Sequence, residues 1–326
     1  MSGAVVDLTA IIPCHNEAEN VQPAYAEIKR ELARYGDAEL LFIDDGSTDA
    51  TLDRVKQLAA LDPNVKYLSF SRNFGQEAAF SAGFKYARAT WTVQFDADLQ
   101  APASEVHKLI AKALEGYDAV FSYRPHRRDP LHRRLGSGLL NWVAVRLGIE
   151  LPRGAWGFRM VRTSVARRVV DLRLASPYFL ATVPLLTCRW TRVPVEHRER
   201  AHGPGKWTFR KLAVHAIDLF TGFSFRALVP VYLLAAAATV TAAVLVGLLA
   251  AGRVPPDTVG AAILAVQGAM FLGLAVVARY LVRVVKGQAR PPLYIIRDGN
   301  LPVDPADDLY QGEREAVPAW REGRVR

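Results

Sequence analysis

Cysteine is scarce in this sequence, and two long stretches lack charged residues altogether. Cys14 and Cys188 are the only cysteines among 326 residues, which excludes a disulfide framework and fits a reducing compartment. The N-terminus lacks the basic, apolar and small-residue order of a secretory leader, so we expect the first domain not to be secreted. Residues 228–251 and 259–278 contain no Asp, Glu, Lys or Arg.

Both uncharged stretches are long enough for a helix to cross a hydrocarbon core of ~30 Å. A Gly-Arg-Val-Pro-Pro-Asp segment separates them, so residues 226–286 are predicted to form a transmembrane hairpin; one buried helical pair of a soluble protein is the weaker alternative. The outer ends of the two stretches carry five cations, and the loop between them carries Arg253 alone; the five are Arg226, Arg279, Arg283, Lys286 and Arg290. The positive-inside tendency places the first domain and both termini in the cytoplasm and the protein in the cytoplasmic membrane.

Charge is divided unevenly along the chain. Residues 1–100 contain 9 Lys and Arg against 15 Asp and Glu, whereas the remaining residues contain 32 against 17. The basic excess therefore belongs to the part that contains the hairpin. An anionic leaflet or a phosphate-bearing lipid suits this excess better than nucleic acid, which we do not expect as a partner.

Predicted strands and helices alternate in the first 125 residues. The strands are expected at Leu8–Ile12, Glu39–Ile43, Val65–Phe70, Trp91–Phe95 and Asp118–Tyr123. The helices are expected at Glu17–Tyr35, Thr51–Leu61, Gln76–Ala87 and Ser104–Glu115. This order predicts an α/β domain over residues 1–205, with a mostly parallel sheet, helices on both faces and a ligand site at the carboxyl ends of the strands.

Polar clusters follow four of these strands, at 13–17, 44–49, 71–75 and 96–100. Any one of them could be ordinary turn or capping chemistry, but four on one edge predict a binding cleft. In an extended segment Asp96 and Asp98 would project to one side, with Gln100 close behind. Their hard oxygen ligands suit Mg²⁺ or Mn²⁺, although a bare Asp-X-Asp is more often a surface turn.

The four clusters together resemble family 2 glycosyltransferases of the GT-A fold. They read Pro13-X-X-Asn16-Glu17, Asp44-Asp45-Gly46-Ser47-X-Asp49, Ser71-Arg72-Asn73-Phe74-Gly75 and Asp96-Ala97-Asp98-Leu99-Gln100. More narrowly, the chain is similar to polyprenyl-phosphate hexose transferases, from about Leu8 to Arg297. The resemblance implies a nucleotide diphosphate sugar as donor, bound by Pro13, Glu17, Asp44, Asp45 and Asp96. It also implies a metal ion held by Asp96, Asp98 and Gln100.

Residues 122–173 contain 12 arginines against 3 acidic residues. Arg124, Arg133 and Ser137 match family positions that hold the phosphate of the acceptor lipid, and guanidinium forks suit phosphate oxygens. The resemblance therefore implies a catalytic set of Asp98, Arg124 and Arg133. A solvated basic face is the alternative for such arginines. The family also has a Lys-aromatic pair where this chain has Lys206, which could close over a phosphate or be an exposed lysine.

The remaining segments carry weaker signals. Residues 206–225 are predicted to form an amphipathic helix at the membrane interface, and residues 287–326 a cytoplasmic segment whose tail from Val303 is mobile. Gly157 departs from the family, whose relatives carry an aspartate there, and this change could alter sugar choice or rate. The spacing of His107, His126 and His132 fits no common zinc pattern.

These observations predict transfer of one sugar, with inversion, from a nucleotide diphosphate sugar to a polyprenyl phosphate of the undecaprenyl or dolichyl type. Two alternatives stay open: a membrane glycosyltransferase with a glycan or glycolipid acceptor, and a degenerate, non-catalytic membrane subunit. The sequence identifies neither the sugar nor the base. Small residues in the hairpin, such as Gly247, Gly268 and Gly273, allow a homo-oligomer.

Overall fold

The computed structural model describes residues 5–125, 138, 142–172, 178–196, 198, 216–217, 219–253, 255–289 and 292–310. The chain divides into two compact units. The first comprises Met1–Asp129, Pro152–Gly205 and Pro291–Arg326, and the second comprises Pro130–Leu151 and Lys206–Arg290. The C-terminal segment therefore belongs to the unit that contains the sheet.

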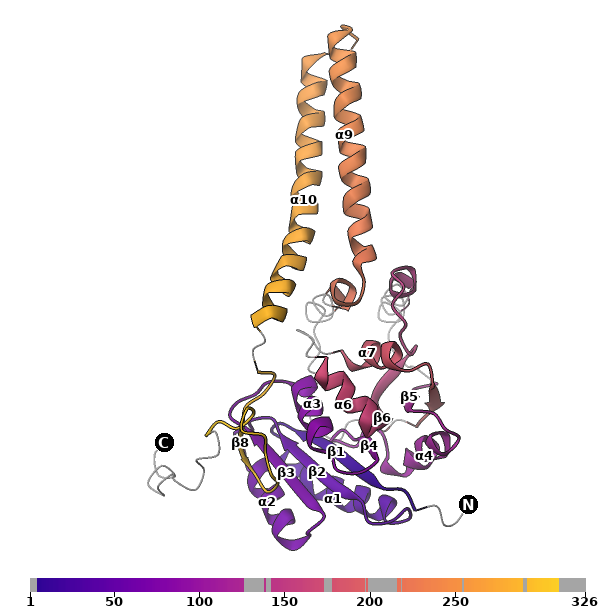
Figure 1. Cartoon of the computed structure of the whole chain (residues 1–326), viewed down its shortest axis with the longest axis vertical. Helices are drawn as coiled ribbons and strands as arrows, with labels where there is room; N and C mark the ends of the chain where they lie inside the picture. The colour runs from indigo at the N-terminus through magenta and orange to yellow at the C-terminus, as the bar shows by residue number, and fades with distance from the viewer. Residues whose placement is uncertain are drawn as a thin grey trace. The chain divides into compact units, whose positions relative to one another are not determined.

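The first unit is built on an eight-stranded sheet with the order β7-β5-β6-β4-β1-β2-β3-β8 (Figure 1). Its strands are β1 (Leu8–Cys14), β2 (Glu39–Asp44), β3 (Val65–Phe70), β4 (Trp91–Gln94), β5 (Ala119–Tyr123), β6 (Ala155–Arg162), β7 (Trp190–Pro194) and β8 (Ile296–Gly299). β1 is buried along nearly its whole length, as its continuous apolar sequence predicts for a central strand. Strands β1 to β4 are parallel, so the loops that follow them emerge at one edge.

Helices cover both faces of this sheet and bury two apolar cores (Figure 1). On one face lie α1 (Ala18–Leu32), α2 (Thr51–Leu61) and α4 (Val106–Leu114), the last preceded by a 3₁₀ turn at Ala103–Glu105. On the other lie α3 (Gln76–Tyr86), α6 (Thr163–Asp171) and α7 (Phe179–Leu186). The predicted α/β class with helices on both faces is confirmed.

Three strands were not predicted, and two of them interrupt the parallel order. β6 lies antiparallel between β4 and β5, with Gln94 opposite Arg159. β8 lies antiparallel along β3 and covers that edge of the sheet. The prediction of a mobile tail from Val303 is wrong for residues 303–310, because Asp304 and Asp307 each lie 2.9 Å from Lys85 Nζ. Residues 311–326 lie outside the described part of the chain.

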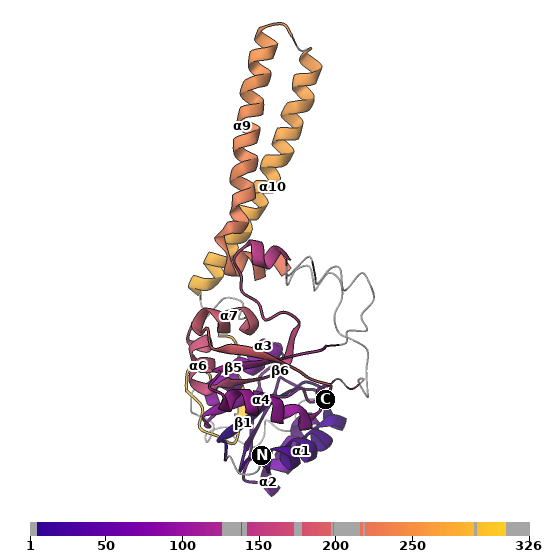
Figure 2. The same ribbon diagram turned by 90° about the vertical axis from the view of Figure 1, so that its right-hand side faces the viewer.

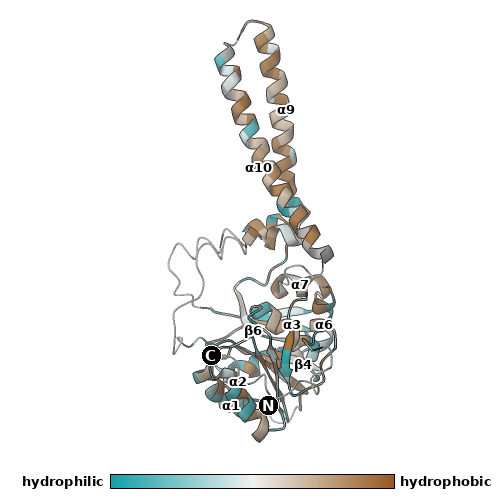
Figure 3. Cartoon of the chain, turned by 90° about the vertical axis from the view of Figure 1, so that its left-hand side faces the viewer, coloured by the Kyte–Doolittle hydropathy of each residue, from teal (hydrophilic) through white to brown (hydrophobic). Residues whose placement is uncertain are grey.

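The second unit contains a pair of long antiparallel helices, α9 (Val229–Ala250) and α10 (Pro256–Ala289), which lie side by side in both views (Figure 2). Their segments Val231–Ala250 and Asp257–Val282 are long and apolar enough to cross a membrane and are almost wholly exposed. Residues coloured as hydrophobic predominate along the pair (Figure 3). Since core helices of soluble proteins are buried, this exposure indicates a membrane protein with a two-helix hairpin.

Candidate functional site

Hydrogen bonds join the loops at the carboxyl edge of the parallel strands. The carboxylate of Asp45, after β2, accepts bonds from the backbone N–H groups of Phe74 (2.6 Å) and Gly75 (2.9 Å), which follow β3. The ring Nδ1 of His15, after β1, lies 2.8 Å from the Asp45 carbonyl oxygen. The loops after β1, β2 and β3 therefore form one connected rim.

The two aspartates after β2 differ in accessibility. Asp44 is fully buried, and its carboxylate accepts bonds from the Ser47 amide (3.1 Å) and the Ser69 hydroxyl (2.7 Å). A side chain without exposed surface is not available to a nucleotide in this arrangement, so Asp44 stabilises the loop instead. Asp45 is 4% exposed; burial raises its pKa, and the bonds from the Phe74 and Gly75 amides act in the opposite direction.

The loop after β1 is held by the loop after β2. Asn16 adopts a left-handed backbone with φ of 55°. Its N–H donates to Ser47 Oγ (3.0 Å), and its side-chain oxygen accepts from the Thr48 amide (2.9 Å). These bonds place Glu17, at the N-terminus of α1, and Pro13, near the end of β1, on the predicted rim. An asparagine in the left-handed region, held by hydrogen bonds of both its backbone and its side chain, is typical of a functional loop.

Asp96, Asp98 and Gln100 lie in a turn after β4, which corrects the expectation of an extended segment. The Leu99 amide donates to the Asp96 carbonyl oxygen at 3.0 Å, and Leu99 has a φ of 47°. Gln100 Nε2 donates to Asp98 Oδ2 at 2.9 Å. The turn thus fixes Asp98 to Gln100, whereas Asp96 accepts a 3.2 Å bond from Gln76 Nε2 on α3.

Strand β6 completes the surroundings of Asp96. Gly157 is opposite Asp96 in the register set by Gln94 and Arg159, and a Cβ atom at Gly157 would lie 3.2 and 3.4 Å from the two Asp96 carboxylate oxygens. The residue that departs from the family therefore directly adjoins the first aspartate of the motif. The sequence indicated that position 157 mattered but not that it faces Asp96, because β6 was not predicted.

The chemistry of these side chains suits a divalent cation bound together with phosphates. Asp96, Asp98 and Gln100 are all partly exposed at the carboxyl edge. No group of three or more His, Cys, Asp or Glu side chains converges to hold a metal within the described ranges. Mg²⁺ and Mn²⁺ are commonly bound by one or two carboxylates while substrate phosphates and water complete the coordination, so the residues present fit such an ion.

Arg124, at the end of β5, extends the same group. Its Nη2 donates to Gln100 Oε1 at 3.3 Å, so Asp98, Gln100 and Arg124 are connected by consecutive hydrogen bonds. The structure therefore brings one predicted phosphate-binding arginine to the predicted metal-binding turn. Other predicted residues lie outside the described residues: Arg133, Ser137, Lys206, His126 and His132.

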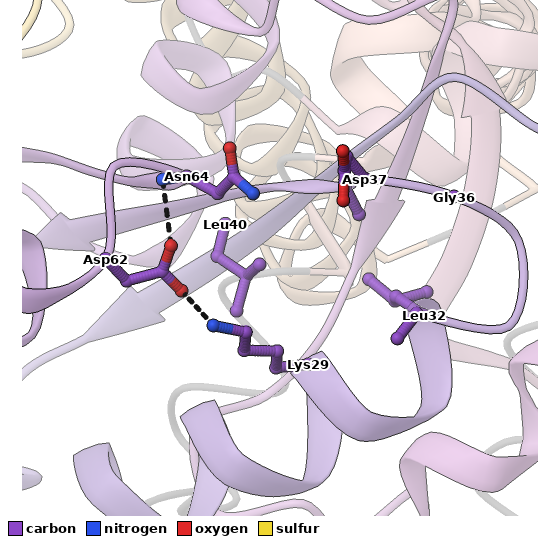
Figure 4. A pocket seen from close by; sticks show the side chains of 9 residues that line it. Lys29, Leu32, Gly36, Asp37, Leu40, Asp62 and Asn64 are labelled. Carbon is purple, nitrogen blue, oxygen red and sulfur yellow. Dashed lines mark hydrogen bonds and ion pairs between the residues drawn. The ribbon is translucent and has the colours of Figure 1, made fainter.

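A separate pocket lies at the opposite end of the strands and does not include the rim residues (Figure 4). It lies between the C-terminal part of α1 and the start of β2, and Asp62 and Asn64 form part of its wall. Lys29 Nζ is 2.6 Å from Asp62 Oδ2 within it. Because these charges already pair with each other and sit away from the loops after β1 to β4, we assign this pocket a structural role.

Comparison with known proteins identifies the family. Residues 9–168 match the model of glycosyl transferase family 2. A relative named "Putative glycosyltransferase CsbB" from Bacillus subtilis (strain 168) is 30% identical over 304 residues, which cover 90% of this chain and 92% of the relative. The chain belongs to glycosyl transferase family 2. It is a glycosyltransferase, and the predicted GT-A-like architecture of this family is confirmed.

Other similar proteins carry more specific names. The undecaprenyl-phosphate 4-deoxy-4-formamido-L-arabinose transferase of Salmonella paratyphi B (strain ATCC BAA-1250 / SPB7) is 28% identical over 305 residues, covering 89% of this chain and 92% of that protein. A crystal structure of glucosyl-3-phosphoglycerate synthase from Mycobacterium tuberculosis superimposes with a TM-score of 0.49 at 18% identity, covering 67% of this chain and 78% of that chain. The matches with the Bacillus subtilis and Salmonella relatives cover nearly the whole chain. They therefore include the hairpin as well as the sheet-containing unit.

Proposed function

We propose that this family 2 glycosyltransferase moves a single sugar from a nucleotide diphosphate sugar to the phosphate of a polyprenol, with inversion at the anomeric carbon. The bond between that carbon and the diphosphate breaks as a lipid phosphate oxygen forms the new bond. A phosphate monoester with a second pKa of about 6 is mostly dianionic at neutral pH, so the acceptor needs little help from a general base. No side chain is proposed as a covalent nucleophile.

The donor is proposed to bind along the rim after β1, β2 and β4. Glu17 and Asp45, which keeps 4% of its surface exposed, are proposed to accept from base N–H groups and ribose hydroxyls, and Pro13 offers an apolar contact. Asp44 supports the same loop from beneath through Ser47 and Ser69. The bonds between these loops fix the acceptors before the donor arrives, which reduces the ordering cost of binding.

Asp96, Asp98 and Gln100 are proposed to hold Mg²⁺ or Mn²⁺ against the donor diphosphate. When bound, such an ion neutralises negative charge that develops on the departing nucleotide. Within the chain itself, Gln76 orients Asp96 and Gln100 orients Asp98, at 3.2 and 2.9 Å. These hydrogen bonds limit the rotation of both carboxylates.

Arg124 is proposed to bind the acceptor phosphate, because its guanidinium reaches Gln100 and so lies beside the metal-binding turn. Arg133, Ser137 and Lys206 are proposed to act with it on the strength of the family resemblance. The hairpin is proposed to hold the enzyme in the cytoplasmic membrane with the sheet-containing unit in the cytoplasm. A lipid-anchored acceptor explains why a single-sugar transferase has membrane-spanning helices.

The consecutive bonds between Asp98, Gln100 and Arg124 carry this proposal, because they join a metal-binding carboxylate to a phosphate-binding guanidinium. The test uses the purified full chain with undecaprenyl phosphate, Mg²⁺ or Mn²⁺, and a panel of labelled nucleotide sugars. Label extracted into the organic phase with one donor supports the proposal. Release of nucleotide only when a glycan acceptor is added supports the first alternative instead, and no metal-dependent release with any donor and acceptor supports a non-catalytic subunit.

A further inference from the structure

An arginine with almost no exposed surface lies behind Asp96 and has no role in the mechanism above. Arg159 on β6 is 3% exposed, and its Nε donates to the side chain of Gln94 across the strand pair. The guanidinium carbon lies 4.3 Å from the ring centre of Phe179 and 5.4 Å from that of Phe80. Burial of a cation on this scale requires nearby negative charge.

Two carboxylates supply that charge, Glu77 and Asp96. Glu77 is in the first turn of α3, directly after the glutamine that donates to Asp96, and three residues before Phe80. Its side chain is only partly exposed, and burial raises its pKa while Arg159 opposes the change. Burial raises the pKa of Tyr178, at the start of α7; the charge of Glu77 raises it further, and that of Arg159 opposes the rise.

The Glu77 carboxylate makes no hydrogen bond or ion pair closer than 4 Å with any residue in the described part of the chain. Glu77 is partly exposed and its oxygens are not among the buried polar atoms without a partner in the described residues, so they remain accessible and can accept hydrogen bonds from a ligand. A ligand with hydroxyl groups would supply the missing donors.

Gly157 leaves room for the carboxylate of Asp96 on this side of β6. Residues 157 and 159 are two apart on one strand, so they face the same side of the sheet, where α3 and α7 also pack. Any Cβ at position 157 would come within 3.2 Å of an Asp96 oxygen. On this face, therefore, position 157 contributes no side chain, and Glu77 contributes a carboxylate from the covering helix.

We propose that Glu77 accepts hydrogen bonds from hydroxyl groups of the donor's sugar, with the buried positive charge of Arg159 nearby to compensate its negative charge. The proposal rests on the function proposed above, since it assumes a nucleotide diphosphate sugar at the rim. A site built to bond a hydroxyl rejects analogues that lack it, because the buried acceptor is then left without a donor. Glu77 would thus set part of the sugar specificity.

The test compares a ligand that has the sugar with one that lacks it. Calorimetry measures the Kd of the full-length wild type and Glu77→Gln for UDP-glucose, UDP-N-acetylglucosamine and GDP-mannose, and for free UDP and GDP, all with Mn²⁺. For the preferred donor we expect Glu77→Gln to weaken binding by roughly 10- to 100-fold, and to change binding of the free nucleoside diphosphate by less than about twofold. An equal loss for both ligands, or no loss for either, would overturn the assignment.

Two controls separate this role from a structural one. Glu19→Gln removes an exposed carboxylate from the first turn of α1 and should leave both Kd values unchanged. If Glu77→Gln does not fold, deoxy analogues of the preferred donor are measured on the wild type and on Glu77→Asp. Loss of affinity for none of the deoxy analogues on the wild type would then contradict the proposal.

Failure of the proposed function has a different signature. Binding requires no acceptor, so a wild type that discriminates nucleotide sugars through Glu77 but never labels undecaprenyl phosphate refutes the acceptor and leaves the sugar site standing. A wild type that binds no nucleotide sugar refutes both.

Discussion

The two sides of the sheet are assembled in different ways. From β1 to β4 the chain repeats strand and helix, the strands are parallel, and the connecting loops supply the predicted donor residues. Beyond β4 the order changes, because β6 is inserted antiparallel before β5 and β7 lies outside β5. We call the strands β1 to β4 the regular side of the sheet; there, loops form the rim. We call the strands beyond β4 the irregular side; there, two residues of a strand, Gly157 and Arg159, lie next to that rim. Position 157 therefore adjoins Asp96, which is 61 residues away in the sequence.

The largest expected effect on the rate of sugar transfer comes from a substitution in the turn after β4, where the two sides of the sheet meet. Asp98→Ala removes a carboxylate proposed to hold the metal and also the acceptor of the Gln100 bond. We expect initial rates of sugar transfer to fall by at least about 100-fold, because charge on the leaving nucleotide is no longer neutralised. Rates are measured by label in extracted lipid, and membrane insertion by carbonate extraction. Wild-type turnover by this variant, or full wild-type activity in excess EDTA, would rule out the metal role.

The next largest effect on the rate is expected from a substitution in β6, on the irregular side alone. Gly157→Ala adds a methyl group 3.2 Å from an Asp96 carboxylate oxygen without requiring a left-handed backbone. We expect the rate to fall roughly 10- to 100-fold with little change in thermal stability, because displacement of a ligand by a fraction of an ångström is costly to catalysis. Gly260→Ala, where an added Cβ meets no atom within 4 Å and which lies in α10, is the control. Equal activity of both variants would mean that Asp96 tolerates the contact.

Sequence and structure agree most closely on the regular side. α2 and β3 begin and end at the predicted residues, because alternation of apolar strands and amphipathic helices determines that part of the fold. β6 was not recognised because its sequence, Ala-Trp-Gly-Phe-Arg-Met-Val-Arg, places a buried arginine and a glycine where a strand pattern would have apolar residues. The turn at Asp96 was mistaken for an extension of β4, because a local bond from Leu99 is not visible in the sequence.

A third effect concerns the edge of the regular side. The Asp307 carboxylate accepts bonds from Lys85 Nζ (2.9 Å) and the Tyr86 hydroxyl (2.6 Å). Asp307→Ala is expected to lower the free energy of unfolding by about 1–3 kcal/mol while rates per folded molecule stay unchanged. Asp304→Ala serves as control, since that side chain is more exposed and its loss should cost less than about 1 kcal/mol. A larger cost for Asp304→Ala would reverse the expected ranking.

The smallest effect is at the far end of the same strands. Burial alone would raise the pKa of Asp62, but bonds from Lys29, the Asn64 amide and Tyr25 outweigh it and lower the pKa below 3.8. The unfolded chain therefore takes up the proton first, so this stabilisation is complete at neutral pH and is lost as the pH falls through 3.8 towards the folded-state pKa. Asp62→Asn should cost about 1 kcal/mol at pH 7 and flatten the acid limb of the stability curve. Denaturant titrations at several pH values test this, with Asp37→Asn as the exposed control in the same pocket.

The position of β8 in the chain has a consequence for biosynthesis. Its four residues come after both membrane helices in the order of translation, yet they complete the edge of β3. A ribosome that has just finished the hairpin therefore leaves β3 with unpaired backbone groups, exposed to association with other nascent chains. Synthesis of the hairpin comes before closure of this edge, so a chain that stops short of residue 296 would carry an open strand even though every proposed metal ligand has already been made.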